Sequence, residues 1–170
     1  MGTKNLFSNE AKQKLKELAE GIDITIMETN LGSKPSHTIP MSTKEVDDEG
    51  CIWFLSNKNS EHNSYLNSDN SIQLIYSKPS DMEFMTVYGQ AFITTDRTVL
   101  EKYYGKSDDT WFDGVDDPNL TAIKVIPEDA YYWDTRHGKF TSLLKMGIGA
   151  LTGKKQDLGE EGDLELNSPK

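Results

Sequence analysis

The chain has 170 residues, which is enough for one domain with a buried core and too few for two comfortable domains. Its formal net charge of -10 at pH 7 argues against nucleic-acid or membrane partners, because surfaces for them need concentrated basic residues. The single cysteine, Cys51, excludes an internal disulfide, and no segment has the apolar length of a signal peptide or a membrane span. We therefore expect a cytoplasmic globular protein.

The charge is unevenly distributed, and this predicts the domain boundary. Residues 156–170 carry five carboxylates and a single lysine, so we expect an acidic tail without fixed structure there. Residues 1–155 are expected to form a single domain.

The amino-terminal part of the chain predicts a helix followed by a strand. Ser8 or Asn9 can cap a helix over about residues 8–20, where apolar residues recur at helical spacing. Isoleucines then alternate with other residues over 22–27, which is the pattern of a half-buried strand. A hairpin turn is expected at 29–33.

Later segments repeat the strand pattern. The predicted strands are 37–43, 51–56, 71–77, 83–94, 121–127 and 130–134. The turns between them are too tight for parallel crossovers, so we predict a mainly β fold, an antiparallel barrel or sandwich of six or seven strands. A few peripheral helices are expected from near Ser60, after Asp96 and, weakened by glycines, over 139–155.

Two segments could bind an anionic ligand. A predicted strand ends at Ser56 and is followed by a polar loop and the start of a helix near Ser60. The free N–H groups at the start of a helix can bind a phosphate. An ordinary capped helix gives the same pattern. The strand with His37 and Ser42 near its ends contains Pro40, which marks an edge or a bulge where a ligand can meet the backbone. An ordinary edge strand explains it equally well.

Other constellations are less informative. A group of late aromatic residues could line a planar cofactor or belong to the core: Trp111, Phe112, Tyr131, Tyr132 and Trp133. The carboxylates around 108–117 lack EF-hand spacing and are interpreted as a solvated loop. The three histidines show no metal spacing with Cys51, so no metal site is predicted.

The order of several short motifs resembles a known family. The motifs lie at residues 40–41, 53–54, 87–91, 111–112, 116–120, 131–134 and 143–160. Together they are similar to the general stress protein branch of the pyridoxamine 5′-phosphate oxidase-like split-barrel flavoproteins, over nearly the whole chain. The resemblance implies a six-stranded antiparallel split β-barrel of the FMN-binding type. It also implies a homodimer with two FMN sites at the subunit interface.

The resemblance assigns the site residue by residue. His37, Thr38, Ile39, Pro40, Met41 and Ser42 would line the flavin ring and ribityl chain. Leu55, Ser56, Ser60, Glu61 and His62 would surround the phosphate. Phe84, Trp111, Trp133 and Lys139 would form the wall of the site, from the partner chain.

The sequence departs from its relatives at the phosphate. They usually carry Arg at the position of His37 and Lys at that of His62, and the oxidase itself has Arg at the position of Glu61. A histidine is mostly neutral at pH 7 and cannot hold phosphate as a guanidinium does. We therefore expect weakened phosphate capture, with a flavin affinity that falls as the pH rises from about 6 to 8.

The function that follows is an FMN-dependent oxidoreductase of unknown substrate. Oxidation of pyridoxamine phosphate itself is not expected, because the general stress branch lacks the arginines that hold that substrate. The alternative is a stress-response protein that binds flavin or another planar cofactor without turnover. A third hypothesis is haem binding through His37, His62 or His137, and an absorption spectrum separates all three.

Overall fold

The computed structural model describes residues 2–3, 6–134 and 160–166. Its strands are β1 (Gly2–Thr3), β2 (Leu6–Phe7), β3 (Ile24–Thr29), β4 (His37–Ser42), β5 (Glu45–Val46), β6 (Ile52–Asn57), β7 (Ser71–Lys78), β8 (Glu83–Thr94), β9 (Leu120–Asp134) and β10 (Glu160–Glu165). Its helices are α1 (Ser8–Ile22), α2 (Glu61–Ser68), α3 (Arg97–Tyr103) and the short 3-10 helix η1 (Lys106–Thr110). None of these helices is long and apolar enough to cross a membrane.

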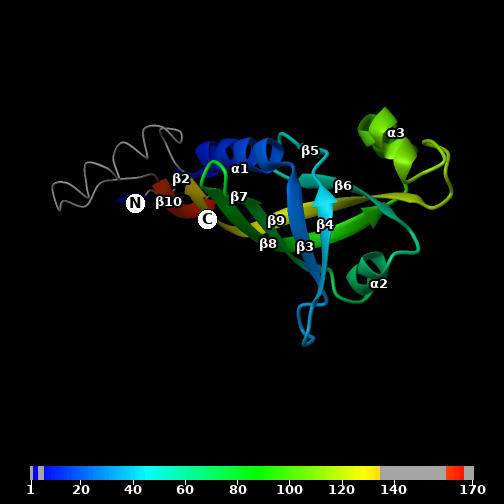
Figure 1. Cartoon of the computed structure of the whole chain (residues 1–170), viewed down its shortest axis with the longest axis horizontal. Coiled ribbons are helices and arrows are strands. Elements are labelled where there is room, and N and C mark those ends of the chain that lie inside the picture. Colours follow the sequence, from blue (N-terminus) through cyan, green and yellow to red (C-terminus); the bar gives the residue numbers. More distant parts are fainter. Residues whose placement is uncertain (1, 4–5, 135–159, 167–170) are drawn as a thin grey trace.

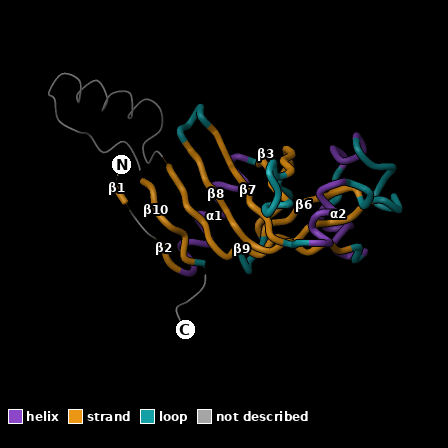
Figure 2. The backbone as a smooth tube through the Cα atoms, turned by 90° about the horizontal axis from the view of Figure 1, so that it is seen from below, coloured by secondary structure: helices purple, strands orange, loops and turns teal. Residues whose placement is uncertain are grey.

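The strands form one curled sheet. Its main path runs β1-β10-β9-β8-β7-β3-β4, and β6 joins through the other half of the long strand β9, with β5 beyond it. All pairings among β3 to β9 are antiparallel, whereas β1 and β2 pair in parallel with β10. Figure 2 shows β7 to β10 side by side with α1 behind them, while Figure 1 places α2 and α3 at the end far from β10.

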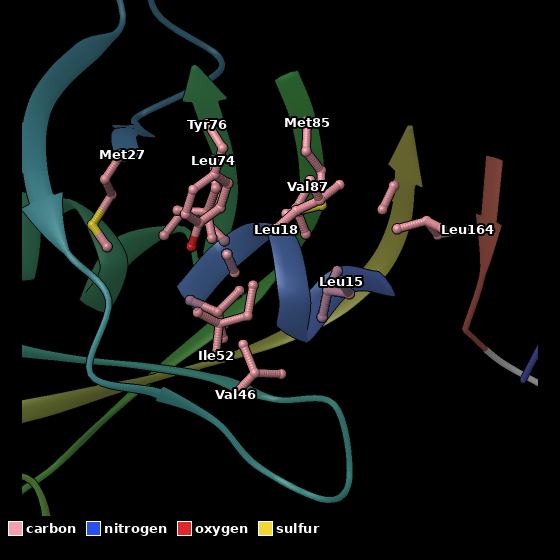
Figure 3. Packing of buried hydrophobic residues seen from close by; sticks show 14 of the residues in the cluster. Leu15, Leu18, Met27, Val46, Ile52, Leu74, Tyr76, Met85, Val87 and Leu164 are labelled. Atoms are coloured by element: carbon pink, nitrogen blue, oxygen red, sulfur yellow. The ribbon is translucent and has the colours of Figure 1, made fainter. Parts of the chain in front are cut away.

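Helix α1 fills the concave face of the sheet. Its residues Leu15 and Leu18 are buried among Ile52 of β6, Val87 of β8 and Leu164 of β10 (Figure 3). Burying an aliphatic side chain of this size contributes about 1.5–3 kcal/mol to the stability of the fold. The packing of this helix face therefore stabilises the curled sheet.

A second, smaller core lies on the outer side of β6 and β9. Trp53 and Leu55 pack there against Leu100 and Tyr103 of α3. Lys44 and the buried carboxylate of Asp108 form an ion pair at 2.6 Å that ties η1 to the rest of the fold. The α3 region is therefore anchored by packing and by charge.

Most of the sequence-based assignments are confirmed. The fold is mainly β with peripheral helices, β8 has the predicted bounds, and β4, β6 and β7 lie within a residue of prediction. Helices α2 and α3 begin after the predicted caps Ser60 and Asp96, whose side chains accept hydrogen bonds from backbone N–H groups. The helix expected over 139–155 lies outside the described residues.

The strand count differs from the six or seven predicted from the pattern and the six implied by the resemblance. Residues 121–127 and 130–134 form the single strand β9, which continues through Pro127. Strand β10 lies in the predicted tail, and for Glu160–Glu165 the expectation of no fixed structure is wrong. Alternate residues of this strand are buried, so Glu161, Asp163 and Glu165 can point outward while Glu160 lies on the buried face and the sheet gains a pairing partner.

The first hairpin also departs from expectation. Residues 30–36 connect β3 to β4, a longer loop than the turn predicted at 29–33. In β3 the side chains of Thr25 and Met27 are buried, whereas Ile24 and Ile26 are 49% and 41% exposed. The isoleucines therefore form an apolar strip on the outer face of the sheet.

Candidate functional site

The candidate site is the corner where α2 meets the ends of β3 and β4. Ser60 caps α2, and its hydroxyl oxygen accepts a hydrogen bond from the backbone N–H of Asn63 at 3.3 Å. The loop before the cap is held by Asn119, whose carbonyl accepts from the N–H of Lys58 at 2.7 Å. This loop fixes the amino-terminal end of α2, whose first N–H groups have no partner within the helix. Figure 1 shows α2 near the ends of β3 and β4, and its Tyr65 contacts His37 of β4.

His37, the first residue of β4, lies against α2. Its ring centroid is 5.3 Å from that of Tyr65 and 6.5 Å from that of His62, and the two imidazole planes differ by 15°. His37 Nδ1 lies 3.6 Å from a carboxylate oxygen of Glu61. The other ring nitrogen, Nε2, is buried and has no hydrogen-bond partner among the described residues.

His62 lies deeper in the corner. Its side chain is hydrogen-bonded to Ser60, with 3.0 Å between Nε2 and Oγ, and the residue is only 9% exposed. Burial, and secondarily the charge of His37, lower the pKa of His62 to about 4. The ring is therefore a neutral hydrogen-bonding group at pH 7.

A buried polar network supports the floor of the corner. The Thr121 hydroxyl donates to the Ser56 carbonyl at 2.9 Å, and its oxygen lies 2.7 Å from Ser56 Oγ. The Asn63 side-chain amide donates to the same Thr121 oxygen at 3.0 Å, and its Oδ1 is buried with no donor in the part of the chain that the structure describes. The hydroxyl of Thr29, the cross-strand partner of His37, is also buried and unpartnered. Unmatched polar atoms thus occur on the three elements that meet at the corner, β3, β4 and α2.

The structure brings together only part of the residue set assigned from the sequence. His37, Ser56, Ser60, Glu61 and His62 lie at the corner. Along β4, Ile39 and Met41 pack against the main core, while Thr38, Pro40 and Ser42 are exposed. Leu55 belongs to the second core.

The predicted wall residues lie elsewhere in the chain. Phe84 and Trp133 face each other across β8 and β9, and the ring centroid of Trp133 is 4.7 Å from that of Tyr131. Trp111 is 78% exposed just after η1. Lys139 lies outside the described residues. Neither the pair nor Trp111 is joined to the corner by any contact within the described chain.

Three residues of the corner were not predicted: Thr29, Asn63 and Thr121. Asn63 follows the cap Ser60 by three positions, the spacing at which a cap receives its hydrogen bond, so the sequence held a signal for it. Thr29 and Thr121 carry no such signal, because threonine is common in strands and their meeting depends on tertiary structure.

One further cluster has metal-binding residue types. Asp47, Glu49 and Cys51 have ligand atoms within 4.8 Å of one another. Both Asp47 oxygens already accept hydrogen bonds, from the backbone N–H groups of Glu49 and Cys51 and from the Trp53 indole. Burial raises the pKa of the Cys51 thiol, which keeps it protonated at neutral pH. The cluster is therefore interpreted as a turn between β5 and β6 that is stabilised by the hydrogen bonds to Asp47.

Comparison with known proteins agrees with the family resemblance. A model of the family described as "Pyridoxamine 5'-phosphate oxidase like" matches residues 10–157. Protein bli-3 of Neurospora crassa is 28% identical over 112 residues, which are 61% of this chain and 54% of bli-3. General stress protein 26 of Bacillus subtilis is 37% identical over 46 residues, which are 27% of this chain and 33% of that protein. The chain thus aligns with about half of one curated relative and a third of the other.

Solved structures share the fold. A structure from Jannaschia sp. CCS1, named as a general stress protein 26, has a TM-score of 0.77 at 23% identity and covers 92% of this chain and 98% of its own. The "general stress FMN/FAD binding protein" of Xanthomonas citri has a TM-score of 0.64 at 19% identity and covers 75% and 90%. The fold is the split barrel of these proteins, and the family match spans most of the chain, so the resemblance to the general stress protein branch is confirmed. The chain belongs to the pyridoxamine 5′-phosphate oxidase-like family.

Proposed function

We propose that the corner between β4 and α2 binds the phosphate end of FMN, and that the protein is a cytoplasmic, flavin-dependent oxidoreductase. The observation that carries the proposal is the set of buried, unpartnered polar atoms there, on Thr29, His37 and Asn63. A buried polar group without a partner costs about 1–3 kcal/mol, so such a group commonly marks a place that a ligand or water completes.

These residues suit a phosphate ester with an adjoining polyol. The N–H groups in the first turn of α2, the Ser60 hydroxyl and the His37 imidazole can donate to phosphate oxygens. Asn63 Oδ1 needs a donor, which a hydroxyl group supplies and a phosphate dianion does not. The bound flavin would supply the redox chemistry by accepting and returning electrons, while the chain binds and orients it.

A second copy of the chain would complete the site. The outer face of the sheet exposes Ile24, Ile26 and Ile75, and Ile26 pairs directly with Ile75 across β3 and β7. A contiguous apolar strip of this kind is typical of a subunit interface. In a homodimer, the partner's Phe84 and Trp133 would approach the flavin ring. This arrangement explains why the pair lies apart from the corner within one subunit.

A non-enzymatic flavin carrier is the second candidate. It is favoured by the charge of the corner: by the family resemblance, His37 and His62 occupy positions where relatives usually carry Arg and Lys, and Glu61 the position of an Arg in the oxidase itself. A weakly held cofactor suits a protein that binds flavin reversibly and does not cycle it through many turnovers.

The test begins with the absorption spectrum of the purified protein and a titration with FMN. We expect saturable binding that His37→Ala weakens at least tenfold, with Gln13→Ala at an exposed, uncharged position of α1 as a control. Absence of binding by the wild-type protein would refute the proposal. Bleaching of bound FMN by a reduced nicotinamide, followed by recovery of colour in air, indicates the oxidoreductase. Binding without such cycling indicates the carrier.

A further inference from the structure

Glu61 places a negative charge where the proposed phosphate must bind. It is the first residue of α2, directly after the cap Ser60, and its carboxylate lies 3.6 Å from His37 Nδ1 although the side chain is 77% exposed. A carboxylate in the first turn of a helix is favourable while the site holds no other anion. The contact with His37 therefore belongs to the ligand-free protein.

A phosphate and this carboxylate need the same partners. Both are anions, both are attracted by the helix terminus, and His37 is a donor for either. A bound phosphate would have to draw His37 away from Glu61 and then remain close to a like charge.

Within the described part of the chain, the contact with His37 is the only ion pair of Glu61. His62 is buried and neutral at pH 7, and Glu28, next to Thr29 on β3, accepts a hydrogen bond from the Ser36 hydroxyl and adds negative charge. Lys58 precedes Glu61 by three positions in the sequence and lies in the exposed loop before the cap. The balance of charge at the corner thus depends on the anionic state of Glu61.

We propose that Glu61 is a charge filter, whose carboxylate engages His37 in the ligand-free protein and disfavours the terminal phosphate dianion of FMN relative to flavins with less charge at that position. The inference rests on the proposed flavin site. The favoured class is a flavin whose first phosphate is a singly charged diester, as in FAD, or one that lacks a phosphate, as in riboflavin.

The size of the effect follows from the charges. Removing one unit charge a few ångströms from a dianion in a hydrated environment strengthens binding about tenfold. A singly charged diester feels half that free energy, so its affinity rises by the square root of the factor, roughly threefold. The affinity for a flavin without a phosphate should hardly change when this charge is removed. Glu61→Gln is therefore expected to raise affinity in a graded order.

The experiment titrates wild-type protein and Glu61→Gln with FMN, FAD and riboflavin at constant pH and ionic strength. The expected gains are about tenfold, about threefold and less than twofold. Glu101→Gln on α3 removes the same charge from an exposed glutamate outside the corner, and it should change none of the three. Equal changes for all three flavins, or no change, would overturn the charge filter.

A second arm separates this inference from the proposed function. If neither protein binds any flavin, the proposed function fails, and the filter is then tested with inorganic phosphate by following the histidine ring signals in NMR spectra. Glu61→Gln should show phosphate-induced shifts of the His37 signals at about tenfold lower concentration than the wild type. Equal midpoints, or no shift in Glu61→Gln, would overturn the inference.

Discussion

Gly89 lies so close to Ile126 across β8 and β9 that a Cβ atom on Gly89 would be 2.2 Å from the Ile126 carbonyl oxygen. The register of the two strands shifts between Tyr88 and Gly89, and Gly89 pairs with Pro127, which has no N–H to donate. The close approach therefore lets β9 continue through a proline at a bulge.

We expect Gly89→Ala to lower the free energy of unfolding by about 2–4 kcal/mol, because a backbone carbonyl cannot move aside as a flexible side chain can. Urea unfolding measures the loss. Gly32→Ala is the matched control, since a Cβ there meets no atom within 4 Å. Equal stability of the two variants would contradict this account of the bulge.

The same bulge explains what the sequence could not reveal about β9. Pro127 looks like the end of a strand, because proline normally leaves the hydrogen-bonded ladder, and only the glycine opposite it permits continuation. Strand β8, in contrast, has the bounds predicted from its run of strand-forming residues between turns. Strand β3 begins and ends two residues later than the predicted 22–27, and the alternation alone did not tell which face is buried.

The candidate site was predictable to the extent that it is local. A strand end, a polar loop and a capping serine follow one another around Ser60, so the start of α2 could be read from the sequence. The approach of His37 to this helix is a tertiary contact between distant segments, and only the family resemblance suggested it. The network joining Ser56, Asn63 and Thr121 depends on tertiary structure in the same way.

His62 should make the ligand-free protein sensitive to acid. Its pKa is about 4 in the folded protein and about 6.5 in an unfolded chain, so between these values the unfolded state binds more protons. Stability contributed by the neutral ring is complete above pH 6.5 and is lost as the pH falls towards 4, by up to about 3 kcal/mol. Denaturant unfolding at several pH values in this window measures the loss.

The control for acid sensitivity is His62→Gln, which keeps a polar side chain without the titration. Carboxylates destabilise both proteins on acidification, so the informative quantity is the difference between the two stability profiles. That difference should change by up to about 3 kcal/mol between pH 7 and 4.5. Parallel profiles would show that His62 is not held neutral by burial.

Acidification should strengthen FMN binding at the proposed phosphate site, although it weakens the ligand-free protein. A bound phosphate raises the pKa of the buried His62 from about 4, so binding takes up a proton and affinity falls as the pH rises. We expect FMN affinity to fall several-fold between pH 6 and 8, as measured by quenching of flavin fluorescence. The phosphate itself gains charge near pH 6, which would change affinity in the other direction if the site were simply cationic.

Riboflavin and His62→Gln separate these contributions. Riboflavin has no phosphate and should bind with little pH dependence, and the variant should reduce the slope for FMN. An FMN affinity that is independent of pH, or the same slope for both ligands, would remove His62 from the phosphate site.

The exposed residues Ile24, Ile26 and Ile75, which form an isoleucine strip on β3 and β7, allow a direct test of dimer formation. Ile26 is 41% exposed and pairs with Ile75, which is 38% exposed, so a lysine at position 26 is easily tolerated in a single subunit. In a homodimer packed through this face, Ile26→Lys would bury charge at the interface and weaken association by at least about 2 kcal/mol.

Sedimentation velocity should therefore show a dimer for the wild type and mainly monomer for Ile26→Lys at low micromolar concentration. Met82→Lys makes the same change at an exposed apolar residue of the β7–β8 turn and should remain dimeric. If the partner's Phe84 and Trp133 complete the flavin site, the Ile26→Lys monomer also loses FMN affinity while His62 keeps its lowered pKa. A monomeric wild type that binds FMN would show that one subunit suffices, and the isoleucine strip would then need another partner.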